Sequence, residues 1–519
     1  MMEDYYCALI GISIATVIML WTLNLLKWSW FKPKELETKL REQGFKGNPY
    51  KFVFGDSKDE ASMGLEAASK PMPTFSNDYH HRVNPLYGHT LSKYGEKSFI
   101  WKGPTPIVNI GDPELIKKVL MKPNDFQKLQ MPPALKRIFH GLAQLEGKEW
   151  VHHRNILNPA FRVEKIKLMV PAFVASSIEM LDKWVQICEK KGSCEVNFWP
   201  YLRELSADAI SRAAFGSSYQ EGRGIFELLT KQLELALPIF RLVYFPGSRF
   251  VPTKKSWLLM KIQSEIRSLL KDIIAKRQEY VRTGEVVLKD DLLGLLLESY
   301  NIGNDNQNGK ISISLEEVVD ECKMFYLVGQ GTTSTLLVWT VLLLSKHQDW
   351  QELARQEAFA TFGNSIPDFS RLNNLKTLNM ILYEVLRLYP PIEETMRKVC
   401  KDMKLGDNVL PAGVQIRLPA VHIHQNQHLW GADAKEFNPG RFKDGLSNAS
   451  GGNVSFFSFG WGPRNCIGSN FAMTEAKVFL VLLLRRFSLN LSPSYLHAPI
   501  GKETIQPQFG AQIIFKLIA

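Results

Sequence analysis

An uninterrupted apolar run near the N-terminus is the first feature of the hydropathy pattern. Residues 5–26 (YYCALIGISIATVIMLWTLNLL) contain no charged residue, and as a helix they are long enough to cross the core of a bilayer. Acidic residues precede the run and basic residues follow it, which predicts an N-terminus outside the cytosol and a body inside it. A cleaved signal peptide is the competing interpretation, but the basic n-region and the small-residue cleavage site are missing.

We therefore predict a membrane anchor over residues 1–26. Residues 27–50 are basic and end in GFKGNPY, and we predict a glycine–proline hinge there between the anchor and the body. No long polar linker or internal repeat follows, so residues 51–519 are predicted to form one domain.

The clearest helical pattern covers residues 314–347 (SLEEVVDECKMFYLVGQGTTSTLLVWTVLLLSKH). Ser314 and Glu317 have the spacing of a capping box at its start. The segment contains no proline and becomes apolar nearly all round, which predicts a helix through the interior of the body. A second membrane span is the alternative, and Lys323 and the glycine- and hydroxyl-rich centre argue against it.

The rest of the body is mostly helical in pattern from about residue 112 to 390, including a shorter helix over residues 373–389. Short β-like stretches occur at 99–103 (FIWKG) and 106–111 (PIVNIG). Residues 391–465 are irregular and rich in proline and glycine, with short strands such as KLGDNVL and QIRLPAV. The predicted fold is therefore mainly α with small β-sheets.

Composition and charge add three expectations. The chain has 519 residues, of which 45% are hydrophobic, so a large core can form. Six cysteines show no CxxC pair and no secreted-scaffold spacing, which indicates a reducing compartment. The net charge of +11 suggests an acidic partner or an anionic membrane surface, with plain solubility as the alternative.

Candidate chemistry concentrates at one cysteine near the C-terminus, in FSFGWGPRNCIGSNF at 457–471. The segment from Gly468 onward has the pattern of a buried helix, so Cys466 would lie at a helix N-terminus, where N–H groups stabilise an anion. Arg464 adds positive charge, and such settings lower the pKa of a thiol. An ordinary buried cysteine in a loop is the alternative.

Two charged or aromatic pairs have helical spacing. Glu384 and Arg387 share one face at i, i+3 in apolar surroundings, where a buried pair needs further partners, and Arg441 is a candidate. Trp150 and Arg154 share a face at i, i+4. Taken alone, either pair would most often be surface decoration.

The centre of the long helix is unusual because Gly329 and Gly331 interrupt it beside Thr332 and Thr333. Glycine costs about 1 kcal/mol relative to alanine in a helix interior. Helix packing is the ordinary explanation. A widened groove that faces a cofactor, with a hydroxyl pointing into it, is the functional one.

In their order and spacing, these motifs resemble those of a microsomal cytochrome P450. The motifs are Phe459-x-x-Gly462-x-Arg464-x-Cys466-x-Gly468, Glu384-x-x-Arg387, Gly329-x-x-Thr332-Thr333 and Trp150-x-x-x-Arg154. Longer stretches such as KLGDNVLPAGVQIRLP and SFFSFGWGPRNCIG are similar to the plant family that includes secologanin synthase. That family oxidises terpenoid-derived substrates.

The resemblance implies a cytochrome P450 fold with a haem b whose iron is bound by the Cys466 thiolate. The other cofactor-binding residues that it implies are Trp150, Arg154, Arg397, Arg464, Phe459 and Gly468. Glu384, Arg387 and Arg441 would form a structural ion-pair network behind the haem.

The resemblance also implies catalytic hydroxyls and a substrate pocket. Thr332 and Thr333 would deliver protons during oxygen activation. The implied pocket residues are Gly329, Phe325, Glu394, Thr395 and Met396, with a lid over residues 120–145 and further walls from 219–250, 325–333, 391–397 and 503–511.

Three positions depart from the family pattern: Gly331 stands where an acid is usual, Gly440 where a glutamate is usual, and Ser458 where a proline is usual. The missing acid could be replaced by water with Thr332, or by Glu393 or Glu394, for which surface exposure is the alternative. A general acid contributes roughly 10²–10⁴-fold, so the chemistry could be slow or altered.

The function expected from the resemblance is that of a haem–thiolate monooxygenase. It would take electrons from NADPH through NADPH-cytochrome P450 reductase and oxidise a small apolar substrate, such as an iridoid, triterpenoid or diterpenoid. The expected location is the endoplasmic reticulum membrane with the catalytic domain in the cytosol, and no nucleic acid partner is expected. Alternatives on the same fold are an O2-independent isomerase or dehydratase, a ring-cleaving oxidase and a non-catalytic haem-binding protein.

Overall fold

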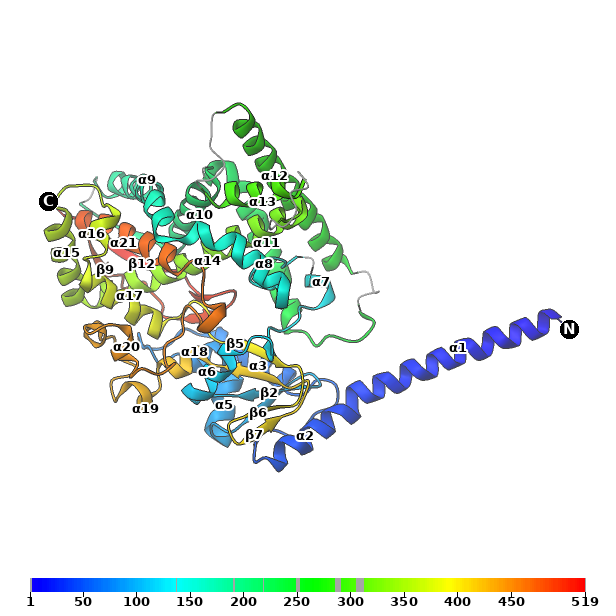
Figure 1. Cartoon of the computed structure of the whole chain (residues 1–519). Helices are drawn as coiled ribbons and strands as arrows, with labels where there is room; N and C mark the ends of the chain where they lie inside the picture. Colours follow the sequence, from blue (N-terminus) through cyan, green and yellow to red (C-terminus); the bar gives the residue numbers. More distant parts are fainter. Residues whose placement is uncertain are drawn as a thin grey trace.

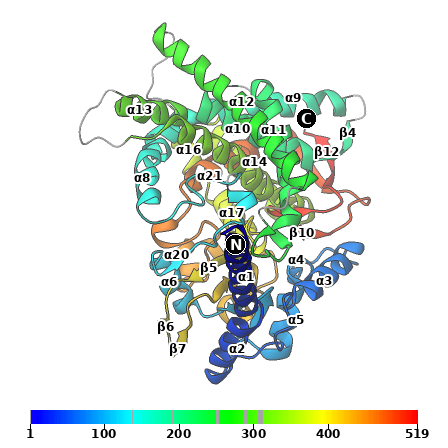
Figure 2. The same cartoon turned by 90° about the vertical axis from the view of Figure 1, so that its right-hand side faces the viewer.

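Most of the chain forms a helical body, from which one long N-terminal helix projects (Figure 1). The computed structural model describes residues 2–136, 138–189, 192–217, 219–248, 253–284, 291–304 and 312–518. In Figure 2 the long helices α9, α10, α11, α12 and α14 lie in the upper part of the body, and the strands β5, β6 and β7 lie in the lower part together with α2, α5 and α6. The expected fold class, mainly α with small sheets, is confirmed.

The projecting helix is longer than its apolar run. α1 (Met2–Leu26) continues through a π-helical turn, η1 (Lys27–Phe31), into α2 (Lys32–Glu42). The first part of the segment expected to be a hinge is therefore helical. Leu36 and Leu40 of α2 are buried in the cluster that covers the large sheet, so this end of the helix is attached to the body by its apolar face.

Two helices in the described part of the chain are long and apolar enough to cross a membrane. The apolar window of the first, Tyr5–Glu42, is 0% buried, whereas that of the second, Leu315–Lys346, is 72% buried. The second is thus an interior helix, as its glycine- and hydroxyl-rich centre indicated. Its capping box between Ser314 and Glu317 is present.

The helices that follow α2 are α3 (Ser57–Ser69), α4 (His80–Val83), α5 (Pro85–Tyr94), α6 (Pro113–Met121), α7 (Pro133–Lys136), α8 (Gly147–Leu157), α9 (Val163–Glu189), α10 (Trp199–Phe215), α11 (Tyr219–Arg241), α12 (Lys254–Arg282), α13 (Leu292–Asn304), α14 (Leu315–Lys346), α15 (Gln348–Phe362), α16 (Phe369–Leu372), α17 (Lys376–Leu388), α18 (Ala420–His424), α19 (Gln427–Trp430), α20 (Leu446–Ala449) and α21 (Ser469–Arg486). Short 3₁₀ segments are η2 (Asn158–Phe161), η4 (Pro439–Phe442) and η5 (Gly462–Arg464).

The largest sheet has the strand order β1-β2-β8-β5-β3. Its members are β1 (Phe99–Lys102), β2 (Thr105–Asn109), β3 (Phe126–Gln127), β5 (Thr395–Val399) and β8 (Gln415–Leu418), and β2 pairs with β8 in parallel. β4 (Ser193–Asn197), β12 (Gln512–Leu517) and β9 (Phe487–Leu491) form a second sheet. β6 (Met403–Leu405) with β7 (Asn408–Leu410), and β10 (Pro499–Gly501) with β11 (Ile505–Pro507), are hairpins.

The main core is built around α14, which packs against α10, α17 and α21. Trp339 of α14 is fully buried, stacks on Tyr389 with ring centroids 4.2 Å apart, and donates from Nε1 to the carbonyl of Ile505 at 2.7 Å. The central helix therefore ties α17 to the C-terminal strands, which fixes the frame for the cysteine segment.

One cysteine pair differs from the expectation of a reducing compartment. Cys188, at the end of α9, and Cys194, in β4, are joined by a disulfide, whereas Cys7, Cys322, Cys400 and Cys466 are free thiols. The fold brings the pair together because the chain reverses between α9 and β4, with Cα atoms 5.0 Å apart. Their spacing in the sequence gave no sign of this pairing.

Candidate active site

The cysteine lies in a loop directly before α21, as the sequence predicted. Its N–H donates to the carbonyl of Phe459 at 2.7 Å, which closes the loop, and Gly468 is the N-cap of the helix. Gly462 has a φ of +70°, and a Cβ there would come within 2.9 Å of the sulfur of Met121 in α6. Only glycine fits this close approach of loop to helix.

The electrostatics of the thiol differ from the prediction. Burial raises the pKa of Cys466, while the N–H of Gly468 and the charge of Arg154 act against that rise. The prediction that the loop alone lowers this pKa is wrong, because desolvation outweighs the helix N-terminus. The residue is nevertheless exposed, so its sulfur faces accessible space while surrounded by protein. A metal ion at the sulfur would deprotonate it.

Four cations meet beside this loop: Lys128, Arg154, Arg397 and Arg464. The guanidinium of Arg464 donates to the carboxylate of Glu146 at 2.6 Å and lies 4.3 Å from the ring centre of Trp150. Arg154 donates to the carbonyl of Asn465 at 3.0 Å. The structure therefore brings Trp150, Arg154 and Arg464 together as the sequence predicted, and we call the four cations the cation cluster.

The cation cluster has more positive charge than its one neighbouring acid can balance. Burial, followed by repulsion from Arg464 and Arg397, lowers the pKa of Lys128 to about 7. Burial likewise lowers the pKa of Arg397 to about 10. The Nε of Arg464 is buried and has no acceptor among the described residues. This donor set fits a ligand with two carboxylates.

Lys128 is a member of the cation cluster that sequence reasoning missed. Its own N–H donates to Glu146 at 3.1 Å and its ammonium donates to the carbonyl of Ala143. No motif surrounds it in the sequence, and it reaches the cluster only because β3 pairs with β5, the strand of Arg397.

The predicted ion pair in α17 is fully buried and its hydrogen bonds are complete. Arg387 donates to both carboxylate oxygens of Glu384, at 2.7 and 2.8 Å. Its remaining N–H groups donate to the carbonyls of His424, Ala434 and Glu436. All five donors of the guanidinium are thus used, and we call this group the α17 network.

Arg441 joins the α17 network, as predicted, but through a longer contact. Its Nε lies 3.6 Å from the carboxylate of Glu384, whereas its NH2 lies 2.9 Å from that of Asp433. At Gly440, where a glutamate is usual in the family, a Cβ would face Asn438 and Trp350. Asp433 therefore supplies the carboxylate for Arg441.

The α17 network is connected to the cysteine loop by two hydrogen bonds. Burial lowers the pKa of His424 to about 3, so its ring is neutral and its Nε2 accepts from the N–H of Phe457 at 3.0 Å. The hydroxyl of Ser458 donates to the carbonyl of Leu386 in α17 at 2.7 Å. The departure from proline at position 458 thus provides a direct bond to α17.

The structure separates the roles of the two glycines in α14. A Cβ at Gly329 would come within 2.8 Å of Ile210 in α10, whereas one at Gly331 would meet only Thr504, at 3.9 Å. Gly329 therefore serves helix packing, and its place in a substrate pocket stays a prediction. Gly331 has room for a side chain.

The two threonines also differ. Thr332 is accessible, and its hydroxyl donates to the carbonyl of Val328 at 2.9 Å. Thr333 is only 2% exposed, since its face of α14 packs into the core. Thr332 is therefore the accessible hydroxyl of the two, and the catalytic role of both threonines stays a prediction.

The pocket residues predicted around β5 occupy different faces. Glu394 is ion-paired with Arg417 at 2.9 Å and accepts from Asn84 at 2.7 Å, so its carboxylate has a structural role. Met396 packs against a small cluster of Leu86, Ile100 and Ile107. Because side chains alternate along a strand, only Thr395 shares the face of Arg397. Glu394 and Met396 therefore have structural contacts, and their place in a substrate pocket stays a prediction.

Phe325 stacks on Phe161 of η2 with ring centroids 5.4 Å apart, and a Cβ at Gly468 would lie 3.9 Å from Phe161. Phe325 is therefore near the cysteine loop. Val328 and Ile392 expose apolar side chains in the segments expected to form the walls, and sequence reasoning did not single them out.

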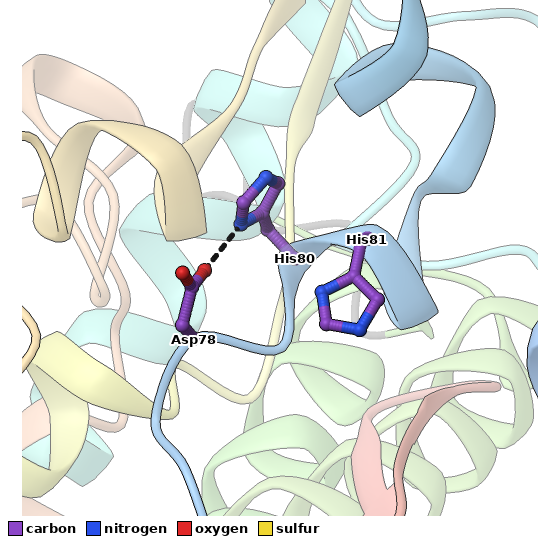
Figure 3. A group of neighbouring side chains, drawn as sticks. All are labelled: Asp78, His80 and His81. Atoms are coloured by element: carbon purple, nitrogen blue, oxygen red, sulfur yellow. Dashed lines mark hydrogen bonds and ion pairs between the residues drawn. The ribbon is translucent and has the colours of Figure 1, made fainter. Parts of the chain in front are cut away.

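A separate group of metal-ligating side chains, Asp78, His80 and His81, lies far from Cys466 in the sequence (Figure 3). Nδ1 of His80 lies 2.8 Å from Asp78, and the other carboxylate oxygen of Asp78 is ion-paired with Lys435 at 2.6 Å. The ammonium already balances the carboxylate and would repel a metal ion. This cluster is therefore an ion-pair network of the surface.

Comparisons with known proteins identify the class of this fold and site. The model of the cytochrome P450 family matches residues 77–512. The chain belongs to the cytochrome P450 family.

Its relatives are plant enzymes of nearly the same length. The chain is 47% identical to echinocystic acid 23-monooxygenase of Saponaria officinalis, over 98% of this chain and 99% of the relative. It is also 47% identical to secologanin synthase 1 of Catharanthus roseus, over 98% and 97%. Among solved structures, the retinoic acid-bound cyanobacterial CYP120A1 matches with a TM-score of 0.73 at 21% identity, over 90% of this chain and 97% of the other.

The family implies an oxidoreductase with a haem held by a cysteine thiolate, and the residues present fit this group. The exposed Cys466 offers a soft ligand. The cation cluster offers donors for two carboxylates, such as the two propionates of a haem.

Proposed function

We propose that the protein is a membrane-anchored monooxygenase that inserts one oxygen atom from O2 into an apolar, terpenoid-derived substrate, using electrons from NADPH. The observation that carries the proposal is the exposed Cys466 before α21, beside a cluster of four cations that has Glu146 as its neighbouring acid among the described residues. The haem, when bound, supplies the activation of oxygen.

The roles of this chain's own residues follow from their contacts. Cys466 would bind the iron, and the cation cluster would hold the propionates through charge-assisted hydrogen bonds. The α17 network orients the loop that carries Cys466, through His424 and Ser458.

Proton supply is where this chain departs from the family pattern. The hydroxyl of Thr332 donates to Val328, so its free lone pair can hold a water molecule. Glu394 is ion-paired with Arg417 and is a poor replacement for the missing acid. We infer that Thr332 with water carries the proton, and that Gly331 leaves room for that water.

Gly331→Asp tests this inference because the position has room for a side chain. If proton supply limits the reaction, the variant should increase the fraction of NADPH consumption that yields product. The matched control is Gly329→Ala, where the added methyl group meets Ile210, so that variant should lose stability without improving coupling. Unchanged coupling in Gly331→Asp would show that protons come by another route.

The names of the relatives support the substrate class. Echinocystic acid and secologanin are both terpenoid-derived, and the chain aligns with both relatives over nearly its full length. The exposed apolar side chains of Val328 and Ile392 are compatible with such a substrate.

The apolar surface near the anchor supports a location on the endoplasmic reticulum membrane, with the body in the cytosol. Trp28, just after the anchor, contacts Phe245 with ring centroids 5.8 Å apart, and Phe54 contacts the same ring at 6.3 Å. In this location the chain would take electrons from NADPH-cytochrome P450 reductase.

The proposal is tested by incubating the full-length protein in microsomes with the reductase, NADPH and terpenoids, including echinocystic acid. The proposal expects NADPH- and O2-dependent formation of a product one oxygen heavier, and Cys466→Ala should abolish it. Product formation without NADPH would instead support an O2-independent isomerase, the alternative that Gly331 favours.

A further inference from the structure

Leu135 of α7 and residues 138–145, which belong to the predicted lid and which we call the lid segment, pack against helices that are distant in sequence. It contributes to a small apolar cluster, which we call the lid cluster, whose buried members are Leu135, Ile138, Phe139, Ala236 and Leu259. Ala236 belongs to α11 and Leu259 to α12, and Leu327 of α14 packs against the same cluster. In Figure 2, α11 and α12 lie at the top of the body with α14 beneath them.

A buried ammonium group connects these elements. Lys323 of α14 is 2% exposed, and its Nζ donates to the carbonyl of Ile138 and, at 3.1 Å, to Oε1 of Gln263 in α12. The same oxygen of Gln263 accepts from Nε2 of Gln232 in α11 at 3.0 Å. One ammonium group thus joins the lid segment and α12 to α14 directly, and α11 through Gln263.

The chemistry of Lys323 is unusual for a residue with a packing role. Both of its acceptors are uncharged, and burial lowers its pKa to about 8, with Asp320 acting in the opposite direction. Asp320 is engaged by Arg267 of α12, and lies 3.3 Å from His140 of the lid segment. Burial of an apolar side chain at this position would cost less free energy than burial of an ammonium group. The lysine therefore indicates that its directional hydrogen bonds to Ile138 and Gln263 have a role.

We propose that Lys323 is a positioning residue that sets the register of the lid segment, α11 and α12 over α14, and thereby determines which bulky molecules reach the site. The inference rests on the proposed function, because these elements cover a substrate only if the protein has one. Thr332 follows Lys323 on the same helix, so the register of the lid is set relative to the site.

The test compares Lys323→Met with Lys477→Met in the full-length holoenzyme. Lys477 is the matched control, since it is also a buried lysine that donates to a carbonyl, that of Leu372, but it lies in α21 away from the lid. The probes are imidazole, which is small, and clotrimazole, which is bulky, and their association and dissociation rates are followed by absorption.

We expect Lys323→Met to change the clotrimazole rates by about five- to tenfold and the imidazole rates by less than about twofold, because only the bulky probe requires the lid to open. Hydrogen exchange in residues 131–136 and 138–141 should also accelerate. Lys477→Met should change neither. Unchanged clotrimazole rates and unchanged exchange in Lys323→Met would overturn the proposal.

A second variant keeps the proposal testable if Lys323→Met does not retain haem. Gln263→Leu removes the shared acceptor and leaves the lysine in place, so exchange should accelerate in both α11 and α12. Unchanged exchange there would also overturn the proposal. Hydrogen exchange needs no turnover, so a failure to oxidise terpenoids would count against the proposed function and not against the role of Lys323.

Discussion

The Glu384–Arg387 pair of the α17 network and the cation cluster are both buried groups of charges, yet they differ in how fully the chain satisfies them. Arg387 has five N–H donors and five acceptors within the protein. The cation cluster has four cations against Glu146, and Arg464 has a buried donor without an acceptor among the described residues. An ion pair whose hydrogen-bond donors all have acceptors within the protein serves the fold. A group of buried cations with more positive charge than its acid can balance indicates an anionic ligand.

The largest loss of stability is expected from breaking the Glu384–Arg387 ion pair of the α17 network. Glu384→Ala leaves the buried charge of Arg387 unpaired, which should lower the free energy of unfolding by about 3–5 kcal/mol. Thermal unfolding of the variant would measure the loss, and haem should be lost with the fold. A normal haem spectrum in Glu384→Ala would contradict a structural role for this pair.

Removing a cation from the cation cluster should have the opposite effect on the stability of the haem-free protein. Arg397→Leu removes a buried charge that repels its neighbours, so the haem-free protein should be as stable as the parent or more stable. The holoprotein should bind haem more weakly, by about 1.5–3 kcal/mol for a lost bond to a charged group. Unfolding and haem transfer to apomyoglobin, each measured for parent and variant, separate the two effects. If Arg397→Leu destabilised the haem-free protein and the holoprotein equally, the cation cluster would not differ from the α17 network in the way described.

The pH dependence of the haem-free protein gives a third prediction. The pKa of Lys128 is about 7 in the folded protein, below the pKa of a lysine in the unfolded chain. At a pH between these two pKa values, the unfolded chain therefore holds a proton on Lys128 that the folded protein has lost. Stability should therefore rise with pH above about 7, as the cost of burying the charge is relieved. Denaturant unfolding at several pH values would show the slope, and Lys128→Met should flatten it. A slope that persists in Lys128→Met would assign the effect to other groups.

The smallest effect is expected at the connection between the α17 network and the cysteine loop. Ser458→Ala removes the bond to the carbonyl of Leu386, at a cost of about 1 kcal/mol. The melting temperature should fall by about 1 °C while the haem spectrum stays normal. A larger loss, with a changed spectrum, would mean that this bond positions the thiolate as well as the loop.

The parts of the site that the sequence predicted are local in the chain. The cysteine loop, the start of α21 and the spacing of Glu384 and Arg387 depend on a few consecutive residues, so motif and helical period were sufficient. The long helix was predicted for the same reason, since its capping box and apolar pattern lie within one segment.

The parts that were missed depend on tertiary structure. Lys128 joins the cation cluster through the pairing of β3 with β5, and no local pattern reports that pairing. Glu394 and Met396 were implied as pocket residues by the family resemblance, and their contacts with Arg417 and with the cluster of Leu86, Ile100 and Ile107 have no local signal in the sequence. The direction of the Cys466 pKa shift was wrong because desolvation depends on everything packed around the sulfur.

The central claim is that Cys466, held by the α17 network and flanked by the cation cluster, binds haem iron as a thiolate. The most direct test is the absorption spectrum of the reduced, carbon monoxide-treated full-length protein in microsomes. The account predicts a band at about 450 nm, typical of thiolate ligation, and its absence in Cys466→Ala. A band at about 420 nm in the parent protein, or no haem band at all, would contradict it.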